Sequence, residues 1–192
     1  MQVAEKTPDA LSFDDVVAIA ELDRKAVDQL ITRSLESDVA LGSQVSQYIV
    51  MSVGKRLRPL IVLLAARALG YKCTQNIQAA AIIEFIHTAT LLHDDVVDSS
   101  SRRRGMDSAN TVFGNQASVL VGDFLYSRSF QMMVDIGDMR VMQILADATN
   151  TIAAGEVMQL MNVHNPDATE EEYRQVIYRK TARLFEAGAQ IA

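Results

Sequence analysis

Three carboxylates within five residues, Asp94, Asp95 and Asp98, are the residues with the clearest potential for chemistry. Residues 77–98 have apolar side chains at three- and four-residue spacing without Gly or Pro, which predicts one long helix ending in these acids. Asp94 and Asp98 would share a face one turn apart, with Asp95 about 100° further round. Three acids near a helix C-terminus repel one another and oppose the helix dipole. A compensating cation is therefore expected, and Mg²⁺, which bridges carboxylates to phosphates, fits best.

The acidic run alone could equally be a metal site or a solvated helix end. Basic residues on both sides of it in the sequence favour the metal site. Lys55, Arg56 and Arg58 precede a predicted helix N-terminus, where free backbone N–H groups attract anions. Further basic side chains lie in residues 102–104 and 179–180. The guanidinium of Arg can bond two phosphate oxygens at once. The acidic run and the basic clusters together therefore predict a polyphosphate that is held through Mg²⁺ on one side and by Arg on the other.

His87 lies seven residues before Asp94 and would point from the same helical face into the same space. A single His on an apolar helix is more often a satisfied core residue. The Glu84-x-x-His87 spacing also suggests a di-iron bundle, but such a site needs a second Glu-x-x-His pair, and the sequence has none.

Length and composition indicate one domain with a substantial core, because the chain has 192 residues of which 49% are hydrophobic. A net charge of −6 and a pI near 5.0 argue against general nucleic-acid binding. The single cysteine excludes an internal disulfide framework and favours a reducing compartment. No apolar run is long enough to span a bilayer and no signal peptide is visible, so a soluble, cytoplasmic protein with at most peripheral membrane contact is predicted.

Apolar periodicity and capping signals predict helices almost throughout, and we find no strand alternation or repeat. The predicted all-α fold has helices over about 12–35, 39–51, 59–69, 77–98, 115–136 and 138–163, and from residue 169 onward. Ser12 with Asp15, and Thr169 with Glu172, have the spacing of capping boxes. The helical pattern continues to Ala192, which suggests one domain over residues 1–192 with C-terminal helices missing.

Six short motifs occur in an order that resembles the trans-isoprenyl diphosphate synthases, most of all their bacterial long-chain members. They are Gly54-Lys55-Arg56-Leu57-Arg58-Pro59, Leu92-His93-Asp94-Asp95-Val96-Val97-Asp98, Arg103-Arg104-Gly105, Gly122-Asp123-Phe124-Leu125, Gly155-Glu156 with Gln159, and Lys180-Thr181-Ala182 with Phe185. Each is weak alone, but six in sequence are specific.

The resemblance implies an antiparallel helical bundle around a deep central cavity, usually assembled as a homodimer. It implies that isopentenyl diphosphate units are added to an allylic diphosphate, farnesyl or similar, giving a long product such as octaprenyl diphosphate for quinone side chains. The acidic run would be catalytic together with Lys180, with Asp94 and Asp98 binding Mg²⁺. Isopentenyl diphosphate would be held by Lys55, Arg58, His87 and Arg104, with Arg56 a weaker candidate, and the allylic diphosphate by Arg103, Lys180 and Thr181.

Product length is expected to depend on small residues before the acidic run. In the resembling family a bulky residue four or five positions before the run stops chain growth, and here these positions are Thr90 and Ala89. Phe85 is the first aromatic residue below Ala89 that could narrow the passage. Met132 and Met133 are candidates for the floor of the cavity, although apolar methionines at helical spacing are more often ordinary core.

One departure from the family is that no second aspartate-rich motif follows Asp98, so this chain holds half of the expected metal site, and we expect it to be inactive alone. Two alternatives stay open. A class I terpene cyclase uses the same acidic motif but binds no second diphosphate and would not need Lys55 and Arg58. A noncatalytic subunit of a heteromeric prenyltransferase usually loses one aspartate motif, whereas the first motif is intact here.

Overall fold

The computed structural model describes residues 12–36, 44–45, 48 and 54–192. Helices dominate this part of the chain: α1 (Phe13–Ile19), α2 (Glu21–Ser34), α4 (Leu57–Ala68), α5 (Gln75–Val97), α6 (Ala109–Phe113), α7 (Asn115–Ile136), α8 (Met139–Met161), α9 (Glu170–Ile177), the π-helical η1 (Tyr178–Ala182) and α10 (Arg183–Gln190). The predicted all-α class is confirmed. The helix predicted over residues 39–51 lies largely outside the described residues.

Local capping signals set several helix ends as predicted. Ser12 and Thr169 each form a capping box, with Asp15 and Glu172 as the reciprocal partners. After α4, Gly70 is left-handed (φ 74°), and the N–H of the next residue bonds to the carbonyl of Ala66 at 2.9 Å, which is a Schellman end.

Two of the predicted helices are divided in the structure. The helix expected over 12–35 is interrupted at Ala20, whose ψ of 15° separates α1 from α2. The helix predicted over 115–136 is confirmed as α7, and Gly114, with φ 88°, occupies its N-cap position. The C-terminal helix is not continuous α-helix, because five residues from Tyr178 to Ala182 form a π-helical turn between α9 and α10.

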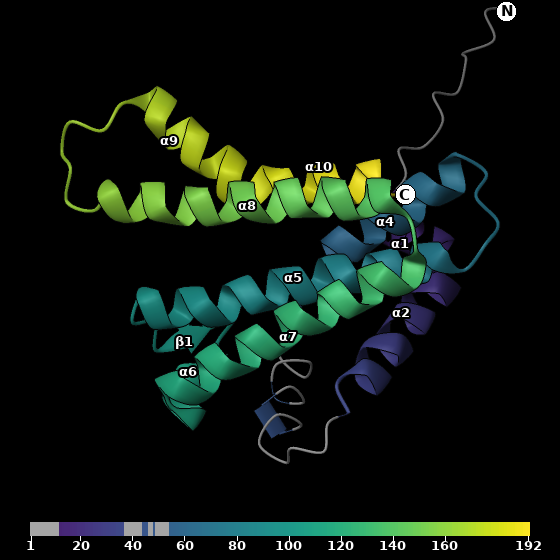
Figure 1. The fold of residues 1–192 in the computed structure, drawn as a ribbon, viewed down its shortest axis with the longest axis horizontal. Helices are drawn as coiled ribbons and strands as arrows, with labels where there is room; N and C mark the ends of the chain where they lie inside the picture. Colours follow the sequence, from purple (N-terminus) through teal and green to yellow (C-terminus); the bar gives the residue numbers. More distant parts are fainter. Residues whose placement is uncertain (1–11, 37–43, 46–47, 49–53) are drawn as a thin grey trace, which may run out of the picture.

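Helix α5 lies at the centre of the bundle (Figure 1) and packs most extensively against α7, and also against α2 and α4. Neighbouring helices run antiparallel, with α8 lying beside α9, η1 and α10 in a layer next to α5. Residues 79–86 of α5 are all buried, in one cluster with apolar residues of α2, α4, α7, α8 and α10. None of the described helices is long and apolar enough to cross a membrane.

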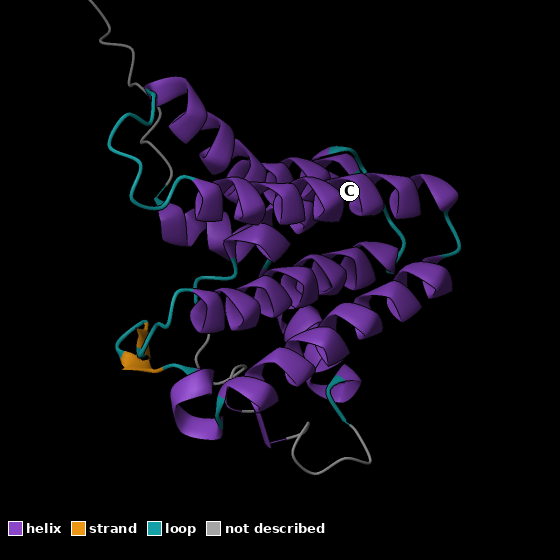
Figure 2. Ribbon diagram, turned by 60° about the vertical axis from the view of Figure 1, so that its left-hand side comes forward, coloured by secondary structure: helices purple, strands orange, loops and turns teal. Residues whose placement is uncertain are grey.

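A small hairpin follows α5 (Figure 2) and corrects the expectation of a loop without strands. Strand β1 (Arg102–Arg103) pairs antiparallel with β2 (Met106–Asp107). The two turn residues, Arg104 and Gly105, have φ of 52° and 82°, as a tight two-residue hairpin requires. Strands of two residues have no detectable alternation, so the pattern of side chains could not reveal them.

Candidate active site

Asp94 on α5 lies beside a cation and a second acid that come from the neighbouring layer. The Nζ atom of Lys180, on η1, lies 3.7 Å from Oδ2 of Asp94 and 2.5 Å from Oε2 of Glu156, on α8. Burial and the nearby Glu156 raise the pKa of Asp94 from 3.8 to about 6, although Lys180 opposes the shift and Asp98 adds to it. Glu156 was noticed in the sequence only as part of a motif, because its partner Lys180 is 24 residues away along the chain.

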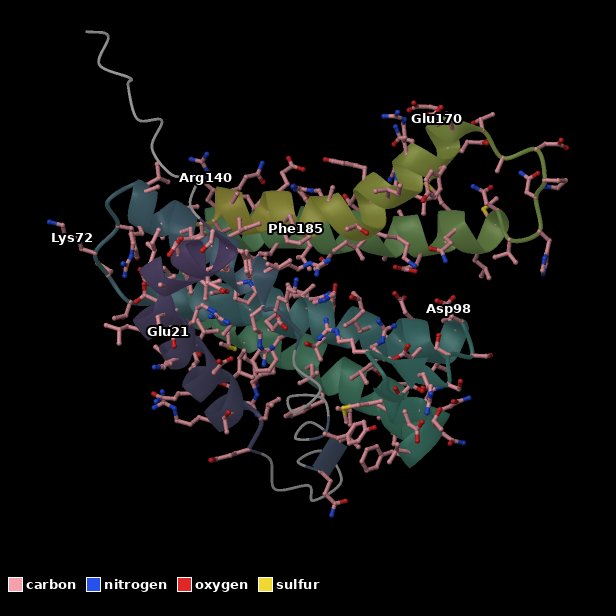
Figure 3. All side chains as sticks on the ribbon, turned by 180° about the vertical axis from the view of Figure 1, so that it is seen from behind. Glu21, Lys72, Asp98, Arg140, Glu170 and Phe185 are labelled. Atoms are coloured by element: carbon pink, nitrogen blue, oxygen red, sulfur yellow. The ribbon has the colours of Figure 1, made fainter. Side chains whose placement is uncertain are left out.

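Helix α5 ends so that Asp98 is exposed one turn beyond Asp94. Asp98 is the C-cap, and Ser99 follows in the left-handed conformation with φ 51°. Figure 3 shows Asp98 at the opposite end of α5 from Lys72, which precedes that helix. The N–H of Ser100 bonds to the carbonyl of Asp95 at 2.9 Å, so the turn leaves the Asp98 carboxylate outside the core.

Asp94 and Asp98 form a donor set that fits Mg²⁺. Both are hard oxygen donors, and burial and the nearby Glu156, which raise the pKa of Asp94, make its negative charge unfavourable without a further cation. In the described ranges no three His, Cys, Asp or Glu side chains cluster as a complete metal site. Two carboxylates are nevertheless what Mg²⁺ uses when substrate phosphates supply other ligands.

Asp95, predicted to be catalytic with Asp94 and Asp98, does not face the same space as Asp94 and is bonded to Arg103 instead. Its side chain is buried, and both carboxylate oxygens accept bonds from Arg103, with Nε at 3.0 and 2.8 Å and Nη2 at 2.7 Å. This bidentate pair raises the pKa of Arg103. Asp95 therefore holds a basic residue of the hairpin, because a rotation of about 100° per residue turns its side chain away from Asp94.

The hairpin directs its two arginines to different places. Arg103 reaches back to Asp95 on α5. The guanidinium of Arg104 lies against Gly54, where a Cβ atom would overlap it and the end of the Arg104 side chain would have to shift. The tight turn thus brings Arg104 beside the first basic cluster, which precedes it by almost fifty residues in the sequence.

Arg58 and His87 form one contact of the first basic cluster with α5. Nη1 of Arg58 lies 2.9 Å from Nε2 of His87, and the guanidinium stacks on the ring of Phe185, with the cation 4.4 Å from the ring centre. Burial and neighbouring arginines, Arg58 first, lower the pKa of His87 to about 3. The imidazole is therefore neutral at pH 7, and Nε2 accepts a hydrogen bond from Arg58, which leaves a proton on Nδ1.

The other two members of that cluster have contrasting surroundings. Lys55 is exposed, with Nζ 5.7 Å from the centre of the Phe13 ring. Arg56 is buried, and its Nη1 donates to Oε1 of Glu84 at 2.6 Å. The structure thus turns Arg56 toward the interior, away from the side on which Lys55 is exposed. Glu84, considered from the sequence only as half of an iron site, is its partner.

The π-helical turn determines where Lys180 points. Its extra residue shifts the register of the last helix, and the backbone of Arg179 and Lys180 lies against Gly155 of α8, where a Cβ would come within 2.7 Å of the Arg179 Cβ. This close approach brings Lys180 to Glu156 and Asp94. Thr181, predicted to act with Lys180, is exposed on the same turn.

A cavity of about 380 Å³ opens beside Asp94 between α5, α7 and α8. Its wall on α5 is formed by Ile86, Thr90, His93, Asp94 and Val97, and most of the surface that lines the cavity is apolar. Of the predicted chain-length residues, Thr90 lies in this wall, but Phe85, Ala89 and Met133 do not; they are buried in the core cluster. The reason is helix geometry, because Phe85 and Ala89 precede the lining residues by one position and point about 100° away.

His93 and Asp123 lie at the polar rim of the same cavity. Nε2 of His93 is 3.3 Å from Oδ1 of Asp123, and the imidazole packs on Gly122, where a Cβ would overlap it. Two of the motifs noted in the sequence therefore meet in space at this point.

An antiparallel helical bundle with acids beside an apolar cavity, a lysine paired to those acids, and arginines gathered against the same central helix is the architecture of an isoprenoid synthase. Residues 39–192 match the family model described as polyprenyl synthetase, and the chain belongs to this family. It is 55% identical to octaprenyl diphosphate synthase of Escherichia coli strain K12 over 180 residues, or 94% of this chain and 56% of that protein. It is 48% identical to the geranyl-diphosphate-specific all-trans-nonaprenyl-diphosphate synthase of Rhodobacter capsulatus, covering 92% of this chain and 55% of that protein.

Solved structures agree with this assignment. A polyprenyl synthase from Caulobacter crescentus, complexed with calcium and isoprenyl diphosphate, has a TM-score of 0.91 and 44% identity over 96% of this chain and 56% of that one. A decaprenyl diphosphate synthase from Rhodobacter capsulatus has a TM-score of 0.89 and 48% identity over 93% of this chain and 55% of that one. The chain spans a little over half the length of the curated relatives that it matches.

Proposed function

We propose that this chain forms part of a long-chain trans-polyprenyl diphosphate synthase. In the proposed reaction the C–O bond of an allylic diphosphate breaks and diphosphate leaves. The double bond of isopentenyl diphosphate forms a C–C bond to the allylic carbon, and loss of a proton restores a double bond. The product is an allylic diphosphate five carbons longer, which can react again.

The residues of this chain would divide the two diphosphates between them. Arg58 and Arg104 act on His87 and, together with the nearby Lys55 of the same segment as Arg58, would bind isopentenyl diphosphate, with the Nδ1–H of the neutral imidazole as a further donor. Lys180 and Arg103 lie on either side of the acidic run and would bind the allylic diphosphate. Asp94 and Asp98 would hold Mg²⁺, which when bound stabilises negative charge on the leaving diphosphate.

The observation that carries the proposal is the stripe along α5. Asp94 lies near one end of a cavity wall that continues through Thr90 to Ile86, so a charged group bound at Asp94 would have an apolar space directly beside it. This is the arrangement that a diphosphate with a hydrocarbon tail requires. The names of the relatives support a product of about eight to ten isoprene units, and octaprenyl diphosphate for quinone side chains is our specific proposal.

Turnover by the protein in its full natural length tests the proposal. With labelled isopentenyl diphosphate, farnesyl diphosphate and Mg²⁺, we expect extended prenyl diphosphates, and we expect Asp94→Ala to abolish them while circular dichroism shows an intact fold. Full activity of Asp94→Ala would refute the role of Asp94. A cyclic hydrocarbon made from the allylic substrate alone would indicate a cyclase, and no product from the folded wild-type protein would indicate a noncatalytic subunit.

The proposed assembly is a homodimer. Helices α7 and α8 expose large apolar side chains that nothing in the described chain covers, including Leu120, Val134, Leu160 and Met161, each more than 60% exposed. Burying such residues against a second copy would remove apolar surface from water. Sedimentation of the protein, followed by charge substitution at Leu120 and Leu160, tests this assembly.

A further inference from the structure

The position of the Arg56 side chain suits a structural role better than that of a substrate ligand. Its side chain is only 8% exposed, and Nη1 donates to Oε1 of Glu84 at 2.6 Å. Its Nε lies 3.4 Å from Oδ1 of Asp28 on α2, whose side chain is 55% exposed. Arg56 borders a small cavity that Arg103 and Arg104 also line, but its guanidinium is paired there with the carboxylates of Glu84 and Asp28.

Glu84 is the only charged residue in the buried run of α5 from Ala79 to Ile86. A carboxylate in such surroundings is unfavourable unless it is paired, and breaking a buried pair leaves an uncompensated charge. The strong, short contact with Arg56 therefore ties α5 to the segment before α4. The ends of this connection are 28 residues apart in the sequence.

The backbone of Arg56 has an unusual conformation at the start of α4. Arg56 is the N-cap of α4 with φ 51° and ψ 41°, a left-handed conformation that a long side chain seldom adopts. Its carbonyl accepts the first hydrogen bond of α4, from the N–H of Leu60, at 3.0 Å. Because the side chain is anchored on Glu84, the ion pair holds the backbone in the turn that starts the helix.

A second contact lies one helical turn away. Arg58 meets His87, and Arg56 meets Glu84, so residues two apart on the segment contact residues three apart on one face of α5. Lys55 and Arg58, the proposed ligands, are the neighbours of the anchored residue. Their separation therefore depends on the conformation at position 56.

We propose that Arg56 and Glu84 are a pair of positioning residues. They fix the segment from Gly54 to Arg58 so that Lys55 and Arg58 can hold one diphosphate together, and neither of the pair contacts that diphosphate. The identity of this ligand as isopentenyl diphosphate rests on the proposed function, whereas the fixing of the segment does not.

The variant Glu84→Gln separates positioning from direct binding in the full-length protein. If the pair positions the segment, the KM for isopentenyl diphosphate rises by roughly tenfold or more, while kcat and the KM for the allylic substrate change by less than about twofold. If Arg56 were itself a ligand, the variant would release its guanidinium, and the KM for isopentenyl diphosphate would fall or stay unchanged. That result, or equal increases in both KM values, overturns the proposal. Asp28→Asn, at the longer and more exposed contact, is the matched control with little expected effect.

Hydrogen exchange of the Leu60 N–H tests the pair without using activity. Arg56→Asn removes the guanidinium but keeps a residue that tolerates the left-handed conformation, so it also serves if Glu84→Gln does not fold. We expect at least about tenfold faster exchange at Leu60 in either variant, with exchange in the middle of α7 unchanged. Unchanged exchange at Leu60 in Arg56→Asn overturns the proposal. A wild-type protein without synthase activity would refute the proposed function, and the exchange result would still decide whether the pair fixes the segment.

Discussion

Replacing Asp94 by Asn is expected to stabilise the fold while it abolishes turnover. The Asp94 side chain is 18% exposed, and burial and Glu156 raise its pKa from 3.8 to about 6, with Lys180 opposing the shift. An acid whose pKa is higher in the folded state favours folding when it is protonated and opposes folding when it is ionised. At pH 7 Asp94 is ionised, so it costs stability, and a neutral amide of the same shape removes this cost.

The magnitude follows from the difference between the two pKa values. A difference of about two would correspond to about 3 kcal/mol if it were fully expressed. Partial exposure and ionic screening reduce it, so we expect Asn to add ~1–2 kcal/mol to the free energy of unfolding. For a chain of this size this raises Tm by roughly 2–8 °C. The difference between variant and wild type should be absent below pH 3.8, grow as the pH rises to about 6, and stay constant above that.

Thermal unfolding between about pH 4 and pH 8, with and without MgCl2, measures these effects. Mg²⁺ should raise Tm of the wild type, because it compensates Asp94 and Asp98, and should raise Tm of Asp94→Asn much less. Asp123→Asn, at a carboxylate 64% exposed on the rim of the same cavity, is the control and should show no such gain. If Asp94→Asn is less stable than wild type at pH 7, or if its advantage does not depend on pH, the electrostatic account of Asp94 is wrong.

Three further predictions concern the substrates, the product and the response to acid. Lys55→Ala should raise the KM for isopentenyl diphosphate roughly tenfold or more, because it removes a charge-assisted bond of ~1.5–3 kcal/mol, and should raise the KM for the allylic substrate much less. Equal increases in the two KM values would show that the basic residues are assigned to the wrong substrates. Thr90→Phe should shorten the product to about three or four isoprene units, because one helical turn of ~5.4 Å is comparable to one unit. Ala89→Phe should mainly destabilise the core, so chain-length analysis and thermal unfolding together distinguish the two variants. An unchanged product from a stable Thr90→Phe would place the growing chain elsewhere. The pKa of His87 is about 3 against an ordinary 6.5, so the stability that its neutral form contributes is present above pH 6.5 and is lost as the pH falls toward 3. In urea titrations, His87→Gln should therefore lose about 2 kcal/mol less free energy of unfolding than wild type between pH 6.5 and about 5. The same dependence of this free energy on pH in both proteins would refute the prediction.

Much of the fold depends on interactions between residues close in the sequence, and these could be predicted. The capping boxes at Ser12 and Thr169 and the ends at Gly70 and Gly137 involve partners within about five residues. The apolar periodicity of residues 77–98 likewise predicts a buried helix with Asp94 and Asp98 on one face. The sequence therefore determined the all-α class, the order of the helices and the place of the acids at the end of α5.

The tertiary structure alone decided which side chain meets which. Asp94 and Asp95 are adjacent, yet one lies beside Lys180 and the other is taken up by Arg103, because the hairpin and the π-helical turn approach α5 from different sides. Arg56, among the basic residues of one motif, turns inward because Glu84 lies opposite it on α5. Likewise, the cavity borders the face of Thr90 rather than that of Ala89, since only the packing of α7 and α8 determines which stripe of α5 stays uncovered. Local propensity acts over a few residues, whereas these contacts join segments brought together by helix packing.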